Sequence, residues 1–243
     1  MQPDEAEQAR AVLLALFPAG FEEVEQRDGV ALFAYTDGAG EELLRRKFGR
    51  ISVVPVEEGW EERWKAFHRG TRIGALWVGP PWEPTPAGAV AVVVDPGLAF
   101  GTGGHASTRL CLELLLDLDR GSLADLGCGS GVIAIAAAKV GFAPVTAIDH
   151  DPQAIAATRR NAKVNGVAVE TRRADLISAE LPAAEVVVAN LSAELVEALA
   201  PRLRADSVIA SGYLERDEPR LDGFRHVLRG TADGWAADLY TRE

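Results

Sequence analysis

Cysteine is scarce in this chain of 243 residues, which contains only Cys111 and Cys128. Two cysteines are too few for a disulfide scaffold and favour a reducing compartment, so we expect a cytoplasmic protein. The four histidines are scattered and form no cluster with the cysteines at metal-ligand spacing. We therefore expect no metal site.

Long apolar runs are also missing. The run at residues 89–94 has the length of a strand, and no run is long enough to span a bilayer, so we expect no membrane-spanning helix. The first segment, MQPDEAEQAR, is acidic and polar, unlike a signal peptide. Hydrophobic residues make up 48% of the chain and charged residues 25%, which is typical of a globular protein with one large domain or a medium and a small one.

Positive charge is in deficit, with 25 Lys and Arg residues against 36 Asp and Glu and a net charge of −11. Binding of phosphates needs a basic footprint, so we expect no free nucleic acid as a substrate. An acidic surface is compatible with a basic protein partner. The alternative is that the charge serves only solubility.

Residues 1–58 have the pattern of a small α+β domain. A helix is predicted over 6–17, strands over 21–25 and 30–35, a second helix over 41–48 and a third strand over 51–56. Acidic residues outnumber basic ones by 14 to 7 over residues 1–64. Because the unit is small for a stable core, we expect it to dock on another element.

Residues 59–72 are predicted to form a linker helix between two domains. Trp60, Trp64 and Phe67 lie on one helical face, and such a face is usually buried against a neighbour. In the second domain, residues 73–243, strands are expected over 73–78 and 89–94, separated by a proline-rich loop, and a helix over 107–118.

From residue 123 onward, short apolar strands alternate with longer helical segments. The expected strands are 123–126, 145–148, 168–171, 186–189 and 207–211, and the expected helices are 132–140, 152–165 and 193–203. This alternation predicts an α/β fold, a mostly parallel sheet with helices on both faces. Segments 224–229 and 235–240 around a turn at Asp233-Gly234 predict an antiparallel hairpin at one sheet edge.

A glycine-rich loop joins the first of these strands to its helix. Gly127, Gly129 and Gly131 lie in ADLGCGSG, residues 124–131. Open α/β sheets bind ligands at the carboxyl ends of their strands, where glycine lets the backbone approach the ligand closely. The strand–loop–helix context therefore predicts a nucleotide-like ligand.

Asp149, with His150 beside it, ends the next strand, 18 residues after Gly131. A carboxylate at this place can accept hydrogen bonds from both hydroxyls of an adenosine ribose. The alternative is that Asp149 caps the following helix, although Asp151 before Pro152 fits that role better.

The competing ligand is NAD(P), whose fingerprint is G-x-G-x-x-G. Its third glycine would fall at Val132, whereas this chain has Gly131. The motif also usually opens a nicotinamide-binding domain, and here about half of the chain precedes it. Both points favour S-adenosyl-L-methionine.

Four features together resemble the ribosomal protein L11 methyltransferase family: residues 95–108 (DPGLAFGTGGHAST), the glycine loop, Asp149 and Asn190-Leu191. That family combines a small amino-terminal substrate-recognition domain, a linker and a class I methyltransferase domain with a Rossmann-like sheet. The resemblance is dense over residues 95–195 and concerns only the domain layout over residues 1–64.

The resemblance implies a set of residues around S-adenosyl-L-methionine. Those that line the site are Thr108, Gly127, Asp149 and Asn190. Those of the loop over the methionine end are Phe100, Gly101, Thr102 and Gly103. A glycine-rich loop there can close and exclude water from a reactive sulfonium. A plain turn is the alternative.

Three more polar residues are candidates near the cofactor. Asp175 follows the third strand, where class I methyltransferases have an acidic or polar residue that meets the adenine amino group; an exposed turn is the alternative. Asp125 begins the glycine loop and is expected to bind the methionine ammonium, directly or through water. His105 is expected to cap or support its loop rather than to act in catalysis.

Asn190 closes the strand at 186–189, across the sheet from the glycine loop. Its amide oxygen can accept an amine N–H and point the nitrogen lone pair at the methyl group. Many amino-methyltransferases have Asn-Pro-Pro-aromatic here, whereas this chain has Asn190-Leu191-Ser192-Ala193, and L11 methyltransferases have an aliphatic residue after the asparagine. The alternative is that Asn190 caps a helix, a role that Ser192 can fill. Asn190 is the expected catalytic residue, and no general base is identified.

These features predict a methyltransferase that acts as a monomer, away from membranes, on lysine or α-amino groups of a basic protein. The resemblance implies ribosomal protein L11 as that substrate. The alternatives are a methyltransferase of another protein or of a small molecule, a cofactor-binding module without catalysis, and an NAD(P)-dependent oxidoreductase.

Overall fold

The computed structural model describes residues 22–26, 29–34, 36, 38–54, 69–95 and 103–243, together with Ala9 and Leu13. The chain divides into two compact units, Met1–Trp60 and Glu61–Glu243. Of the linker helix predicted over 59–72, residues 59–68 fall outside the described residues. Its last four positions are not helical, because Thr71 and Arg72 belong to the first strand of the second unit. Among the described helices, none is both long and apolar enough to cross a membrane.

The first unit contains a hairpin and a helix. Strands β1 (Glu22–Gln26) and β2 (Gly29–Phe33) pair antiparallel, as predicted. Helix α2 (Gly38–Phe48) begins three residues before its predicted start. Two ion pairs lie along its surface, Arg45–Glu41 and Arg46–Glu42, and each joins residues one helical turn apart.

The strand predicted over 51–56 is wrong where the structure describes it. Residues 51–54 have no regular structure, and Val54 is 73% exposed. β-branched residues favour strands, but a strand also needs a partner, and none of the described strands pairs with this segment.

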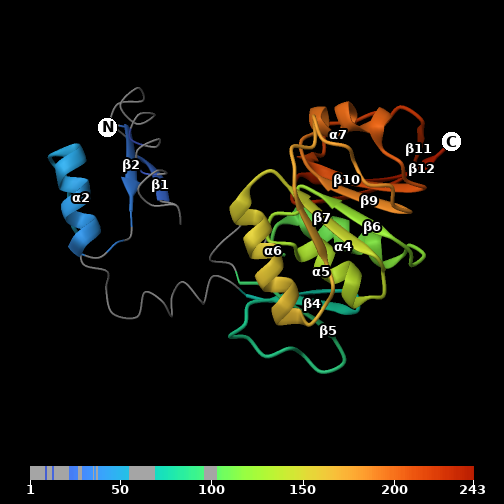
Figure 1. Cartoon of the computed structure of the whole chain (residues 1–243), viewed down its shortest axis with the longest axis horizontal. Coiled ribbons are helices and arrows are strands. Elements are labelled where there is room, and N and C mark those ends of the chain that lie inside the picture. The colour runs from blue at the N-terminus through green and yellow to red at the C-terminus, as the bar shows by residue number, and fades with distance from the viewer. Residues whose placement is uncertain are drawn as a thin grey trace. The chain divides into compact units, whose positions relative to one another are not determined.

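The second unit begins with a small sheet of three strands, β3 (Thr71–Ile73), β4 (Leu76–Gly79) and β5 (Val90–Val93). The prediction of one strand over 73–78 is wrong, because Gly74, at a φ of +54°, turns the chain between β3 and β4. The strand predicted over 89–94 is confirmed as β5, which runs parallel to β4. In Figure 1, β5 lies beside α5 and α6.

A sheet of seven strands forms the centre of the second unit, in the order β11-β12-β10-β9-β6-β7-β8 (Figure 1). The strands are β6 (Leu123–Leu126), β7 (Val145–Asp149), β8 (Glu170–Arg173), β9 (Val186–Asn190), β10 (Ser207–Leu214), β11 (Phe224–Ala232) and β12 (Trp235–Arg242). Neighbouring strands from β8 to β10 are parallel, and β12 is antiparallel to both β10 and β11. The predicted α/β fold with an antiparallel edge hairpin is confirmed.

Helices cover both faces of this sheet. They are α4 (Ala106–Leu116), α5 (Val132–Lys139), α6 (Pro152–Asn165) and α7 (Ala193–Leu199), the last followed by a 3-10 turn, η1 (Ala200–Arg202). Side chains of α4, α5 and α6 share one hydrophobic cluster with Val186 and Val188, whereas those of α7 share another with Val187 and Ala189. Because successive side chains of a strand point to opposite faces, a strand covered on both sides is apolar throughout.

The chain order places a crevice at the carboxyl ends of the strands. From β6 the chain adds β7 and β8 on one side and then returns to add β9 and β10 on the other. Open α/β sheets bind their ligands at such a reversal of strand order. The ends of β6, β7 and β9 are therefore the place to look for a site.

A buried ion-pair cluster holds the carboxy-terminal strands together. The carboxylate of Asp238, 0% exposed, accepts hydrogen bonds from Arg229 at 2.8 Å, from the Tyr213 hydroxyl at 2.8 Å and from the His226 ring at 2.7 Å. Burial alone would raise the pKa of Asp238, but these hydrogen bonds outweigh it and hold the pKa below the usual value. One carboxylate thus connects β10, β11 and β12.

Asp238→Asn is expected to lower the free energy of unfolding by roughly 3–5 kcal/mol, because it leaves the Arg229 guanidinium without its anion. Glu180→Ala, which removes an exposed pair with Arg204, should change it by less than about 1 kcal/mol. Since the folded pKa of Asp238 is depressed, its contribution is present above about pH 4 and is lost as the pH falls through the folded value. Urea unfolding of both variants from pH 7 to pH 3 tests this, and a difference that does not shrink with falling pH would contradict it.

Candidate cofactor and acceptor site

The glycine loop takes a conformation that side chains disfavour. Gly127, Gly129 and Gly131 have φ values of +77°, +52° and +81°, a region that residues with a Cβ rarely adopt. The N–H groups of Gly127 and Cys128 donate to the carbonyl of Ile148 at 2.8 and 3.0 Å. The loop between β6 and α5 is thereby anchored to the end of β7.

Asp149 lies against this loop at the end of β7. Its carboxylate, only 7% exposed as a residue, accepts hydrogen bonds from the N–H groups of Gly129 and Asp151, both at 3.0 Å. The helix cap is Asp151, whose side chain accepts from the N–H of Gln153, so the alternative of Asp149 as the cap is excluded. Asp149 keeps further lone pairs for a ligand.

His150 lies next to Asp149 but points outward. Its Nδ1 is 3.3 Å from Asp149 Oδ1, and its side chain is 84% exposed. The backbone carbonyl of His150 accepts a hydrogen bond from Arg173 at 3.1 Å, which ties β8 to the same edge. A cofactor contact of His150 stays a prediction.

Asn190 and Thr108, 82 residues apart in sequence, meet at the end of β9. The amide nitrogen of Asn190 donates to the Thr108 hydroxyl at 3.3 Å. The amide oxygen is left to accept a hydrogen bond from an N–H group of a ligand. Helix α7 is capped by Ser192, whose hydroxyl accepts from the N–H of Leu195. The capping alternative for Asn190 is therefore excluded.

His105, which was expected to cap or support its loop, caps helix α4. Its Nδ1 accepts from the N–H of Ser107 at 3.3 Å and lies 2.8 Å from the Ser107 hydroxyl. The ring also meets Trp235 edge-on, with 4.5 Å between ring centroids. The start of α4, with Thr108 in its first turn, is thus held beside the sheet.

Asp125 is buried beneath the loop, at 1% exposure. Its carboxylate accepts from the N–H of Ala134 at 3.1 Å, so it satisfies a backbone donor in the first turn of α5, where Gly131 has no side chain to do so. Burial raises the pKa of Asp125 to about 7. Its predicted contact with the methionine ammonium is not tested by these bonds.

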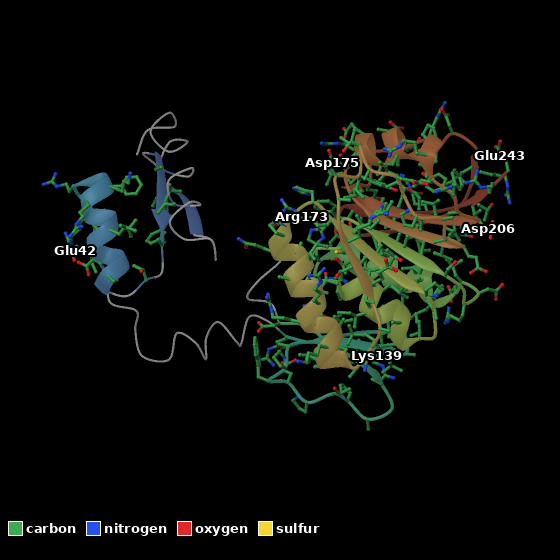
Figure 2. The ribbon with its side chains drawn as sticks, viewed as in Figure 1. Glu42, Lys139, Arg173, Asp175, Asp206 and Glu243 are labelled. Carbon is green, nitrogen blue, oxygen red and sulfur yellow. The ribbon has the colours of Figure 1, made fainter. Side chains whose placement is uncertain are left out.

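Asp175 lies on the surface beyond the end of β8. Its carboxylate accepts from the N–H of Ile177 and from the hydroxyl of Ser178, at 3.0 and 3.1 Å, and so organises the turn that follows the strand. In Figure 2, Asp175 and Arg173 lie on the side of the domain away from Asp206, which precedes β10. Asp175 is therefore at the carboxyl edge of the sheet, where a contact with adenine stays a prediction.

Phe100, Gly101 and Thr102 lie outside the described residues. The remaining predicted site residues are described, and they converge on the ends of β6, β7, β8 and β9. Within the part of the chain that the structure describes, no group of three or more His, Cys, Asp or Glu side chains is placed to hold a metal ion.

Sequence reasoning missed Thr158, which is fully buried on α6. Its hydroxyl donates to the carbonyl of Gly129 at 3.0 Å, and a Cβ on Gly131 would lie 2.7 Å from its side chain. The signal was present in the sequence, as a threonine on the apolar face of an amphipathic helix.

Gly212 was missed as well. It has a φ of +94° and lies at the bulge where β10 shifts its register against β12. A Cβ there would lie 2.5 Å from the carbonyl oxygen of Leu191 and 2.9 Å from the carbonyl carbon of Asn190. The missing side chain lets β10 approach the residue pair that ends β9, and the sequence contains no local sign of this approach.

Comparison with known proteins places these features in a family. Residues 5–224 match the family described as Ribosomal protein L11 methyltransferase (PrmA). The ribosomal protein L11 methyltransferase of Pectobacterium carotovorum is 44% identical over 239 residues, which cover 94% of this chain and 74% of that protein. Its namesake from Sodalis glossinidius is 46% identical over 169 residues, 65% of this chain and 55% of that protein.

A solved structure shows the same fold. The ribosomal protein L11 methylase of Lactobacillus delbrueckii superposes with a TM-score of 0.66 at 27% identity, covering 72% of this chain and all of that one.

Several of the curated relatives are considerably longer than the matched part: the chain spans 55% of the Sodalis protein and 62% of one from Pectobacterium atrosepticum.

Gly212→Ala is expected to destabilise the protein more than Gly223→Ala does. Both glycines have positive φ, but a Cβ on Gly223 meets nothing within 4 Å. Gly223→Ala should cost roughly 1 kcal/mol for backbone strain, and Gly212→Ala a further 1–3 kcal/mol for overpacking against Leu191. Denaturant unfolding measures both, and equal losses would show that the approach at Gly212 does not matter.

Proposed function

We propose that this chain, which belongs to the ribosomal protein L11 methyltransferase family, transfers methyl groups from S-adenosyl-L-methionine to amino groups of a protein, with ribosomal protein L11 as the substrate. One observation carries the proposal. The carboxylate of Asp149 and the amide of Asn190 lie at the same crevice, on either side of the glycine loop.

The residues fit the cofactor chemically. Asp149 is held rigidly by two backbone N–H groups and offers its remaining lone pairs to the ribose hydroxyls. The glycines let the loop backbone approach the ligand. The proposed cofactor-binding set is Phe100, Gly101, Thr102, Thr108, Asp125, Gly127, Gly129, Gly131, Asp149, His150, Asp175 and Asn190.

S-adenosylmethionine, when bound, supplies an electrophilic methyl group. The protein must align an uncharged amine with it. A lysine of pKa about 10.4 is mostly protonated at pH 7, so the free base costs roughly 4–5 kcal/mol. An apolar pocket lowers that pKa. Asn190, with its amide nitrogen turned to Thr108, directs its oxygen to an amine N–H and so orients the lone pair.

The first unit is the proposed substrate-recognition domain, over residues 1–58, and residues 59–72 are the proposed linker. The excess of 14 acidic over 7 basic residues in positions 1–64 suits a basic partner. We infer that the protein works in the cytoplasm as a monomer, without binding free nucleic acid or a membrane.

Asp149→Ala is expected to weaken S-adenosylmethionine binding on the order of 100-fold, because two charge-assisted hydrogen bonds at roughly 1.5 kcal/mol each are lost. Asp151→Ala is the matched control. It removes the cap of α6 at a cost of about 1 kcal/mol in stability and should leave the dissociation constant unchanged. Calorimetric titration decides, and an unaltered affinity in Asp149→Ala would remove the ribose assignment.

Incubation with radiolabelled S-adenosylmethionine and ribosomal proteins should label a band at the size of L11. Asn190→Ala should bind the cofactor within a few-fold of the wild type yet reduce labelling at least about 100-fold, a typical contribution of orientation at the reacting centre. Ser192→Ala, two residues away at the cap of α7, should keep its activity.

Other outcomes of the labelling experiment point elsewhere. Label on a different protein would change the substrate. Cofactor binding without any label would indicate a binding module, and binding of NADH alone would overturn the cofactor. Full turnover in Asn190→Ala would remove Asn190 from the mechanism.

A further inference from the structure

Helix α6 presents a row of buried polar side chains to the rest of its domain. Thr158, Asn161 and Asn165 are spaced by three and four residues, so they share one face of the helix. All three are buried. Buried polar groups are unfavourable unless they are hydrogen-bonded, so the partners of these side chains indicate what the row does.

The first two members hold the glycine loop. The Thr158 hydroxyl donates to the carbonyl of Gly129 at 3.0 Å. The Asn161 amide donates to the carbonyl of Ser130 at 2.9 Å. Two successive carbonyl groups of the loop are therefore fixed to α6.

The third member holds a different segment. Asn165 donates to the carbonyl of Val93 at 2.7 Å and accepts from the N–H of Val93 at 2.8 Å, across 72 residues of sequence. Its amide nitrogen also donates to the carbonyl of Asn161 at 2.8 Å, which braces it on its own helix. The side chain thus satisfies both backbone groups of Val93, as a neighbouring strand would.

Val93 is the last residue of β5 and stands two positions before Asp95, the start of the segment that leads to Thr108. The glycine loop and the end of β5, from which the chain leads to Asp95, are therefore both tied to α6. Thr158, which holds the glycine loop, and Asn165, which holds Val93, are seven residues apart, or roughly 10 Å along the helix axis.

We propose that Asn165 is a positioning residue for cofactor binding, because it sets the start of the Asp95 segment relative to the glycine loop through α6. This inference rests on the proposed function for the identity of the cofactor. Loss of the tie leaves the glycine loop in place, since Thr158 and Asn161 still hold it, but lets the end of β5 shift relative to that loop.

Asn165→Leu tests the proposal, because leucine has a similar size and neither donates nor accepts a hydrogen bond. The matched control is Ala162→Gly, which weakens the same helix by its lower propensity without touching Val93. Calorimetry should show at least a fivefold higher dissociation constant for S-adenosylmethionine in Asn165→Leu and a change below twofold in Ala162→Gly. Hydrogen exchange without cofactor should become faster at the Val93 amide and stay unchanged over residues 127–131.

Unchanged affinity in Asn165→Leu would overturn the proposal. So would a loss of affinity that follows melting temperature equally in both variants, because it would assign the effect to helix stability. A wild-type protein that does not bind S-adenosylmethionine would contradict the proposed function instead, together with the cofactor part of this inference. Exchange at Val93 is independent of the cofactor, and equal rates in the wild type and Asn165→Leu would show that Asn165 does not hold β5.

Discussion

The loop between β6 and α5 takes positive φ at three glycines, which have no side chains to hold it. Hydrogen bonds from neighbouring elements hold most of its backbone in place. The carbonyl of Ile148, near the end of β7, accepts hydrogen bonds from two N–H groups of the loop, and Asp149 accepts one from Gly129. Side chains of α6 donate to two carbonyl groups of the loop. Asp125 accepts a hydrogen bond from the N–H of Ala134, in the first turn of the helix that follows the loop. A backbone held by several partners is a preorganised surface for a ligand.

The same loop stands between the two halves of the proposed site. Asp149 comes from β7 on one side of β6, and Asn190 comes from β9 on the other. This arrangement follows from the reversal of strand order, which leaves a crevice between elements that the chain adds in opposite directions. Asn190 is in turn oriented by Thr108 at the start of α4. The Asp238 cluster holds β10, β11 and β12 together next to β9.

The errors of the sequence-based predictions have physical causes, one local and the others tertiary. The pattern over 73–78 indicated one strand, but Gly74 turns the chain into a hairpin. The β-branched residues at 51–56 indicated a strand, but strands need partners, and pairing is a property of the whole sheet. Gly212 carried no signal, because its importance lies in the approach of β10 to Leu191, which only the register of two strands creates.

The sequence by itself determined the alternation of apolar strands and helices, the family, and the residue types of the glycine loop, Asp149 and Asn190, because these depend on hydrophobic periodicity and on chemistry at fixed spacing. It also indicated the caps Asp151 and Ser192, since capping is local. Only the tertiary structure decided that Thr108 meets Asn190, that Asp125 serves α5, and that α6 ties the glycine loop to Val93. These contacts join residues from separate elements of the chain, and only the packing of those elements brings them together.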